Sequence, residues 1–261
     1  MEIRLERLPG EEAGIVLLGL DRPAAKNALG RQLLAEFREA LSLLAGDRTA
    51  RVVIMHSLVP GVFCAGADLK ERAGMAPAEA ATFVQDLRAA FTEFEDLPMP
   101  TLAALDGAAF GGGLELALAA DLRVAGAGAK MGLVETSLAI LPGAGGTQRL
   151  PRLIGASRAK ELIFTARRIG AEEASRLGLV NRVVGAGMAL DSALALAREI
   201  LPNGPVALRL AKRAVNGGVD LDRTAGLALE QACYAQVIPT LDRLEGLAAF
   251  RDKRKPQYRG E

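Results

Sequence analysis

The chain has 261 residues, half of them apolar, and its 32 basic and 31 acidic side chains leave a net charge of +1. A chain of this length can bury a substantial core, and the lack of a basic surplus removes the electrostatic case for non-specific nucleic-acid binding. The single histidine, His56, excludes a multi-histidine metal site, so we expect no bound metal. Two distant cysteines, Cys64 and Cys233, indicate a reducing setting rather than a disulfide framework.

The first part of the chain alternates short apolar runs with helical patterns. Gly14–Leu20 and Arg51–Ser57 are predicted strands, and between them apolar residues recur at helical spacing through Arg31–Ala45. Two further strands are predicted at Thr101–Leu105 and Asp121–Ala125. The order of strand, helix and strand predicts an α/β protein with largely parallel strands.

After about Asn181 the pattern becomes helical. Helical spacing covers Ala189–Leu201, Pro205–Asn216 and Leu221–Phe250, and no strand is predicted between them. We therefore divide the chain into an α/β core, residues 1–180, which we expect to hold the active site, and a helical C-terminal region, residues 181–261.

The N-terminal sequence has no apolar segment typical of a signal peptide. The most apolar stretch, Thr101–Ala120, contains two carboxylates, which a membrane span would rarely carry. We therefore expect a cytoplasmic protein without a membrane partner.

Two isolated glutamates each lie beside a glycine-rich segment. Glu115 is the only charge between Asp106 and Asp121, and Glu135 stands among apolar residues shortly before a loop rich in glycine and alanine. If they are buried, desolvation raises their pKa values and prepares them for acid-base chemistry, which falls to carboxylates where histidine is scarce. Alternatively, Glu115 is an exposed glutamate in the first turn of a helix, where it complements the helix dipole. Glu135 would then be an ordinary loop carboxylate.

A third motif, residues 63–70 (FCAGADLK), follows a predicted strand and turn. Its small residues expose backbone amides that could hold an oxyanion or a phosphate. A plain connection from strand to helix is the alternative. The known nucleotide-binding motifs are absent, because no Gly-Lys-Ser/Thr tripeptide occurs and no glycine cluster completes the dinucleotide-binding pattern.

Taken together, three segments resemble the enoyl-CoA hydratase/isomerase (crotonase) superfamily: FCAGADLKE at 63–71, DGAAFGGGLELALAADLRVA at 106–125 and MGLVETSLAILPGAGGTQRLPR at 131–152. Within it the chain is most similar to the methylglutaconyl-CoA hydratases, also described as AU-rich-RNA-binding enoyl-CoA hydratases. The resemblance implies a spiral of ββα turns, with C-terminal helices that form homotrimers, often paired into homohexamers.

The resemblance also implies the activity and the catalytic groups. It predicts reversible addition of water across the 2,3 double bond of a trans-2-enoyl-CoA. The amides of Ala67 and Gly112 would hold the thioester oxygen, Glu115 would deprotonate the attacking water, and Glu135 would exchange the proton at Cα. Coenzyme A enters as part of the substrate, and no further cofactor is implied.

The same resemblance assigns the residues around the CoA thioester. Its adenine would lie against backbone of Ala65, Asp68 and Leu69. Its phosphates would lie near Lys26, and its acyl group beside Gly143. Phe250 and Lys253 would reach the CoA from a neighbouring subunit.

Four alternatives stay open. An enzyme of the same fold could isomerise the double bond or hydrate methylglutaconyl-CoA, or the chain could bind acyl-CoA without catalysis. An RNA-binding protein with weak hydratase activity is the alternative from another class. Residues 33–51 contain no lysine and three acidic residues, and so do not resemble the lysine-rich helix of the RNA-binding relative. We therefore expect no nucleic-acid partner.

Overall fold

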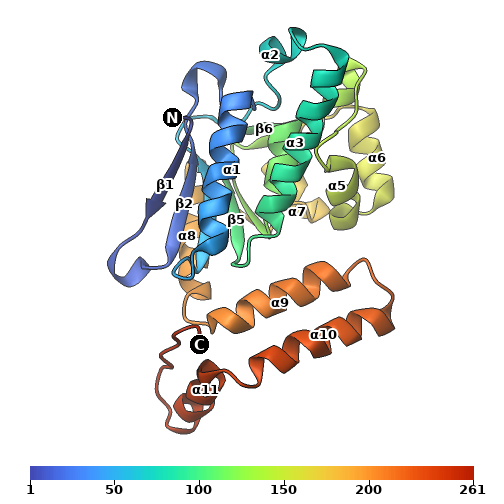
Figure 1. Ribbon diagram of the computed structural model, residues 1–261. Helices are drawn as coiled ribbons and strands as arrows, with labels where there is room; N and C mark the ends of the chain where they lie inside the picture. The colour runs from blue at the N-terminus through green and yellow to red at the C-terminus, as the bar shows by residue number, and fades with distance from the viewer.

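The computed structural model describes residues 1–261 and contains two β-sheets surrounded by helices (Figure 1). The larger sheet has six strands, which are parallel except for the antiparallel pair β1–β2. In spatial order its strands are β1 (Ile3–Arg7), β2 (Ile15–Leu20), β3 (Val52–Ser57), β5 (Thr101–Leu105), β7 (Leu122–Gly126) and β10 (Arg182–Val184). The predicted α/β class with largely parallel strands is confirmed.

The smaller sheet has four short strands in the order β4 (Val62–Cys64), β6 (Ala108–Phe110), β8 (Lys130–Gly132) and β9 (Ile169–Gly170). Three times in succession, a strand of the large sheet is followed by a strand of the small sheet and then by helix. This repeat is the spiral of ββα turns that the sequence resemblance implies.

Helices cover both faces of the large sheet. On one face lie α1 (Arg31–Gly46), α3 (Pro77–Glu95) and the buried α4 (Gly112–Leu118), in a core where the rings of Phe37 and Phe94 lie 5.9 Å apart. The shorter helices are α2 (Leu69–Ala73), α5 (Gly146–Ile154), α6 (Ala156–Phe164) and α7 (Ala171–Leu177), with single 3-10 turns at Gly10–Glu12, Pro23–Ala25 and Glu135–Leu138, the last labelled η3.

No strand was predicted between the C-terminal helices, and none lies there, but one short strand that was not predicted precedes them. Strand β10 pairs in parallel with β7, and α8 (Ala189–Ile200) lays Ala193 and Ala197 against the sheet. These two elements pack with the core, although residue 180 was the predicted boundary. A three-residue strand is too short to show a clear alternation of apolar and polar residues, so its sequence gives little signal.

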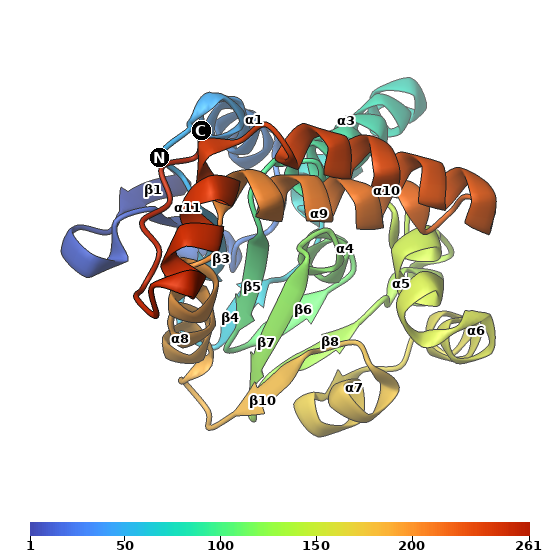
Figure 2. The same ribbon diagram turned by 90° about the horizontal axis from the view of Figure 1, so that it is seen from below.

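The remaining helices form a C-terminal arm, residues 205–251. Helices α9 (Pro205–Gly218) and α10 (Arg223–Val237) lie below the sheets in the view of Figure 1 and run side by side (Figure 2), and α11 (Leu241–Arg251) follows. The single helix predicted over 221–250 is divided near Pro239, and the side chain of Thr240 caps α11 by accepting a hydrogen bond from Arg243 N. A helical C-terminal region is thus present. No helix of the chain is long and apolar enough to cross a membrane.

Candidate active site

Helix α4 places a charged side chain inside the protein. It begins after Gly111, whose φ of 52° favours glycine, and all its residues are buried. Glu115, its only charge, is 3% exposed, and its Oε1 accepts hydrogen bonds of 2.8 Å from the amides of Ala144 and Gly146. Burial raises the pKa of Glu115, and the two amide hydrogen bonds oppose that rise.

The second glutamate reaches the same place from a different element. Glu135 begins the 3-10 turn η3 and is 8% exposed, and neither of its carboxylate oxygens has a hydrogen-bond partner. A Cβ placed on Gly111 would lie 3.2 Å from Oε1 of Glu135. Burial, followed by the charge of Glu115, raises the pKa of Glu135 to about 7.

Two backbone amides belong to residues that line the same cavity as these carboxylates. The amides of Ala67 and Gly112 donate to no acceptor within the chain. A Cβ on Gly112 would lie 3.8 Å from the nitrogen of Ala67 and 3.9 Å from Oε2 of Glu115, so both amides and this carboxylate are close neighbours. Such a pair of free N–H groups can stabilise an oxyanion.

The chain around Ala67 is held by backbone pairing with Leu29. Leu29 N donates to the oxygen of Gly66 over 2.8 Å, and Asp68 N donates to the oxygen of Leu29 over 3.0 Å. Leu29 also lies against Gly112, the residue of the second amide. A Cβ placed on Gly112 would lie 2.8 Å from Cδ1 of Leu29. Leu29 was not predicted as a site residue, because nothing local to it indicates a contact 38 residues away along the chain.

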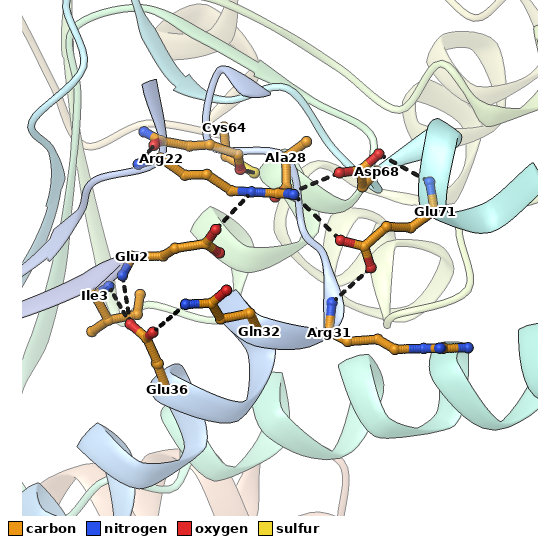
Figure 3. Close-up of polar contacts among 11 residues, drawn as sticks. Glu2, Ile3, Arg22, Ala28, Arg31, Gln32, Glu36, Cys64, Asp68 and Glu71 are labelled. Atoms are coloured by element: carbon orange, nitrogen blue, oxygen red, sulfur yellow. Dashed lines mark hydrogen bonds and ion pairs between the residues drawn. The ribbon is translucent and has the colours of Figure 1, made fainter. Parts of the chain in front are cut away.

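An ion-pair cluster around Arg22 fixes the same loop (Figure 3). The guanidinium of Arg22 contacts Glu2 at 2.9 Å, Asp68 at 2.8 Å and Glu71 at 3.3 Å, and donates to the oxygen of Ala28 at 2.7 Å. The carboxylate of Asp68 also caps α2 by accepting from the amides that follow it. The side chain of Asp68 therefore serves the loop. Its backbone is also engaged, because its amide donates to the oxygen of Leu29 and its oxygen accepts from the amide of Arg72.

The carboxylates and amides line one cavity of about 620 Å³. The predicted site residues around it come from the 65–69 loop, α4, the turn η3 and the loop before α5: Ala65, Ala67, Leu69, Gly112, Glu115, Glu135 and Gly143. Segments that are far apart in the sequence thus form a single site.

Four predicted residues lie outside this cavity. Lys26 is exposed but adjoins it, because its oxygen accepts a hydrogen bond of 3.1 Å from Ala65 N. Asp68 belongs to the Arg22 cluster. Phe250, at the end of α11, is 87% exposed, and Lys253 is exposed just beyond it, so neither meets the cavity within one chain.

Three arginines that were not predicted as site residues also line the cavity: Arg72, Arg88 and Arg168. No motif marked them, because each is one arginine among many on an otherwise ordinary helix or loop. Their side chains meet at the cavity only through the fold.

The chain belongs to the enoyl-CoA hydratase/isomerase family, whose model matches residues 10–261. This confirms the resemblance and an enzyme of the enoyl-CoA hydratase type. Full-length relatives support it. The chain is 55% identical to the human "Methylglutaconyl-CoA hydratase, mitochondrial", with 100% of this chain and 78% of that protein covered. It is 53% identical to the human "Enoyl-CoA hydratase domain-containing protein 2, mitochondrial", with coverages of 100% and 90%.

A solved structure is similar over the whole length. The enoyl-CoA hydratase from Bacillus anthracis superposes with a TM-score of 0.97 at 47% identity, and 100% of each chain is covered. This agreement confirms the crotonase fold of the chain.

The expectation of a cytoplasmic location is contradicted. Relatives from human, mouse and Arabidopsis thaliana are named mitochondrial. The expectation rested on the lack of a secretory signal and on cysteine usage, and neither feature separates the cytoplasm from another reducing compartment.

Proposed function

We propose that this enoyl-CoA hydratase adds water across the 2,3 double bond of a trans-2-enoyl-CoA with two glutamates and a backbone oxyanion site. The observation that carries the proposal is the convergence of two buried carboxylates and two free amides on one cavity. The thioester oxygen accepts from the amides of Ala67 and Gly112. Since negative charge develops on this oxygen during addition, the two donors stabilise the transition state.

The two carboxylates have different surroundings, which suits different roles. Two amides hold Oε1 of Glu115 in a fixed position, so Glu115 orients water and takes one of its protons. The hydroxyl oxygen bonds to Cβ, and the π electrons move onto the thioester oxygen as an enolate. Glu135, with its pKa raised to about 7, delivers a proton to Cα as the enolate collapses. Proton exchange with solvent then restores both carboxyl groups.

The CoA part of the substrate extends from this point along the 65–69 loop. Backbone at Ala65, Asp68 and Leu69 would meet the adenine, Lys26 would lie near the phosphates, and Gly143 beside the acyl group. The adjacency of Lys26 and Ala65 supports this path. The reaction requires no cofactor beyond the CoA of the substrate.

The C-terminal arm would assemble the protein into a homotrimer or homohexamer. Its helices expose large apolar side chains that a lone chain leaves in water: Leu227, Tyr234, Leu244, Leu247 and Phe250. In that assembly Phe250 and Lys253 would reach the CoA of a neighbouring subunit. Light scattering after gel filtration tests the assembly, and a monomer at micromolar concentration would contradict it.

Hydration of crotonyl-CoA, followed by loss of the enoyl-thioester absorbance, tests the reaction. Glu115→Gln and Glu135→Gln should each lower kcat by about 10²–10⁴-fold with little change in KM. Near-normal turnover in both variants would overturn the mechanism. Chromatography of the products separates hydration from isomerisation, and ligand binding without turnover would identify a non-catalytic binder.

Hydration of methylglutaconyl-CoA is a second candidate. It is favoured by the name of the human relative at 55% identity. The same assay with that thioester tests this candidate. Arg72, Arg88 and Arg168 in the cavity are positively charged, which would suit the carboxylate of that thioester.

A further inference from the structure

The loop that holds Glu115 is itself held by a side chain of α5. The amides of Ala144 and Gly146 donate to Oε1 of Glu115 over 2.8 Å each. Between them, Gly145 has a φ of 114°, and a Cβ at this position would collide with Nη1 of Arg149. The guanidinium of Arg149 therefore packs directly against the backbone that supplies the two hydrogen bonds to Glu115.

Arg149 connects this loop to the end of α3. Its Nη1 donates to the oxygen of Ala144 over 3.1 Å, and its Nε and Nη2 contact Oε2 of Glu95 at 3.1 Å and 2.6 Å. The side chain of Arg149 is 12% exposed, so solvent ions screen this pair less than they screen a pair on the surface. The loop, the start of α5 and the end of α3 are thus joined around Glu115.

Arg149 does not line the cavity that contains Glu115 and Glu135. It lines a second cavity, of about 550 Å³, whose walls include Leu208 and Val215 of α9. The guanidinium of Arg149 therefore lies behind the loop, where it does not meet a substrate bound between the two carboxylates. Any effect of Arg149 on the reaction must pass through Glu115 and its loop.

Charged side chains from three elements act on the Glu115 carboxylate. Burial raises the pKa of Glu115, while its amide hydrogen bonds, the charge of Arg149 on α5 and the charge of Arg88 on α3 lower it. Glu135 in η3 is the neighbouring acid, and the N-terminus of α5 also favours a negative charge at this position. Arg149 thus favours the ionised form of Glu115, which is the form that can accept a proton from water.

We propose that Arg149 is a positioning residue for hydration: its guanidinium holds the 143–146 loop against α3, so that the loop amides keep Glu115 in place and ionised. The proposal rests on the proposed hydratase function and deepens the account of its general base. A side chain that only stabilises the fold could also lower activity when it is removed. The experiment must therefore follow the pH dependence as well as the rate.

Arg149→Met removes the cation and its hydrogen bonds together. With crotonyl-CoA, kcat should fall about tenfold or more with little change in KM, as expected for a misplaced catalytic group. The acid limb of kcat/KM should also move to higher pH by about half a unit or more, because Glu115 then binds its proton more readily. Initial rates from pH 4.5 to 7 measure both effects. An acid limb at the wild-type pH would leave Arg149 only a structural role and overturn the proposal.

Two further variants separate the charge from the packing. Arg149→Lys keeps the charge and should restore most of the pH shift. Glu95→Gln removes the partner carboxylate and leaves the cation, so the acid limb should move to lower pH. Damage to the fold alone would act in the same direction in Arg149→Met and Glu95→Gln, so an upward shift in Glu95→Gln would overturn the proposal. Because the side chain of Glu95 is 36% exposed, this variant keeps the test decisive even if Arg149→Met does not fold.

Arg152→Met is the matched control on the same helix. Arg152 pairs with Asp220 at 2.9 Å on the surface and makes no contact with the 143–146 loop. Its replacement should leave kcat and the acid limb unchanged. If the wild-type protein does not hydrate crotonyl-CoA, the proposed function itself fails. If the wild type hydrates it and the acid limb of Arg149→Met is unshifted, only the role of Arg149 fails.

Discussion

Glu115 and Glu135 share one cavity but differ in their hydrogen bonds. Glu115 accepts two amide hydrogen bonds of 2.8 Å on one oxygen, whereas neither oxygen of Glu135 has a partner. Burial and the nearby charge of Glu115 raise the pKa of Glu135 to about 7. The pair therefore keeps one proton at a pH at which two isolated carboxyl groups would both be deprotonated.

The pH dependence of hydration follows from this proton. We expect kcat/KM for a short 2-enoyl-CoA to fall about tenfold per pH unit above about pH 7, because Glu135 then loses the proton that we propose it delivers to Cα. Initial rates from pH 5 to 9 measure this limb. Samples returned from pH 9 to pH 6.5 should regain full activity, which controls for unfolding. A rate that stays level up to pH 9 would contradict the role given to Glu135.

Glu135 also affects stability. Its pKa rises on folding from 4.5 to about 7, so its contribution to stability is fully present below pH 4.5 and is lost as the pH rises through 7. Glu135→Gln should therefore be more stable than the wild type at pH 8 by up to about 3 kcal/mol, and this advantage should shrink towards pH 5. Urea unfolding at both pH values measures the difference. Glu161→Gln on the exposed α6 is the control, and an equal gain at both pH values would refute the explanation.

Gly113 lets α4 approach the small sheet. A Cβ at this position would lie 2.2 Å from the oxygen of Cys64 and 2.8 Å from its Cβ. Gly113→Ala should thus lower the free energy of unfolding by about 1–3 kcal/mol, or prevent folding, and should reduce activity by moving α4. Gly46→Ala, at a position with open space around it, should be tolerated. Thermal unfolding compares the two variants, and equal melting temperatures would be the contrary result.

The role of Arg22 can be tested separately from the chemistry. Arg22→Met leaves Glu2, Asp68 and Glu71 without their shared cation, so we expect a loss of about 1–3 kcal/mol in stability. It should also lower kcat, since the 65–69 loop carries the amide of Ala67. Arg4→Met is the control: Arg4 pairs with Asp21 but its side chain is 64% exposed, and such surface pairs contribute about 0–1 kcal/mol. Unchanged stability and kcat in Arg22→Met would disprove the coupling.

The proposed contact of Lys253 with CoA in a neighbouring subunit predicts a change in binding alone. Lys253→Ala should raise KM for the enoyl-CoA about fivefold to tenfold, with kcat and the oligomeric state unchanged, as for loss of one charge-assisted contact. Lys255→Ala, two exposed residues further along, should have no effect. Steady-state kinetics and light scattering on the same samples measure both. An unchanged KM would remove Lys253 from the CoA site.

Local sequence patterns predicted the longer elements well. The strand Thr101–Leu105 is β5, predicted from a short apolar run that follows two prolines. The helix expected over Arg31–Ala45 is α1, predicted from apolar residues at helical spacing. The small sheet was largely missed, since its strands have two or three residues and depend on pairing between turns of the spiral. Such short strands form because of tertiary contacts, and a local sequence pattern carries no information about those contacts.

The carboxylates were found for a similar reason and the arginines were missed. Glu115 and Glu135 stand among apolar and glycine residues, where a charge has no ordinary surface role. Arg72, Arg88 and Arg168 belong to segments with many other charges, and only the folded chain shows that they face the same cavity. Arg72 and Arg168 are 96 positions apart along the chain, so no short window of sequence contains both.

The free amides of Ala67 and Gly112 have a consequence for how such a protein changes over evolutionary time. Because these donors belong to the main chain, only a change to proline, which has no backbone N–H group, would delete one of them. Replacement of Glu115 or Glu135 could redirect the chemistry while the proposed oxyanion site for the thioester persists. Chemical synthesis with an ester in place of one peptide bond would remove a single donor and measure its contribution directly.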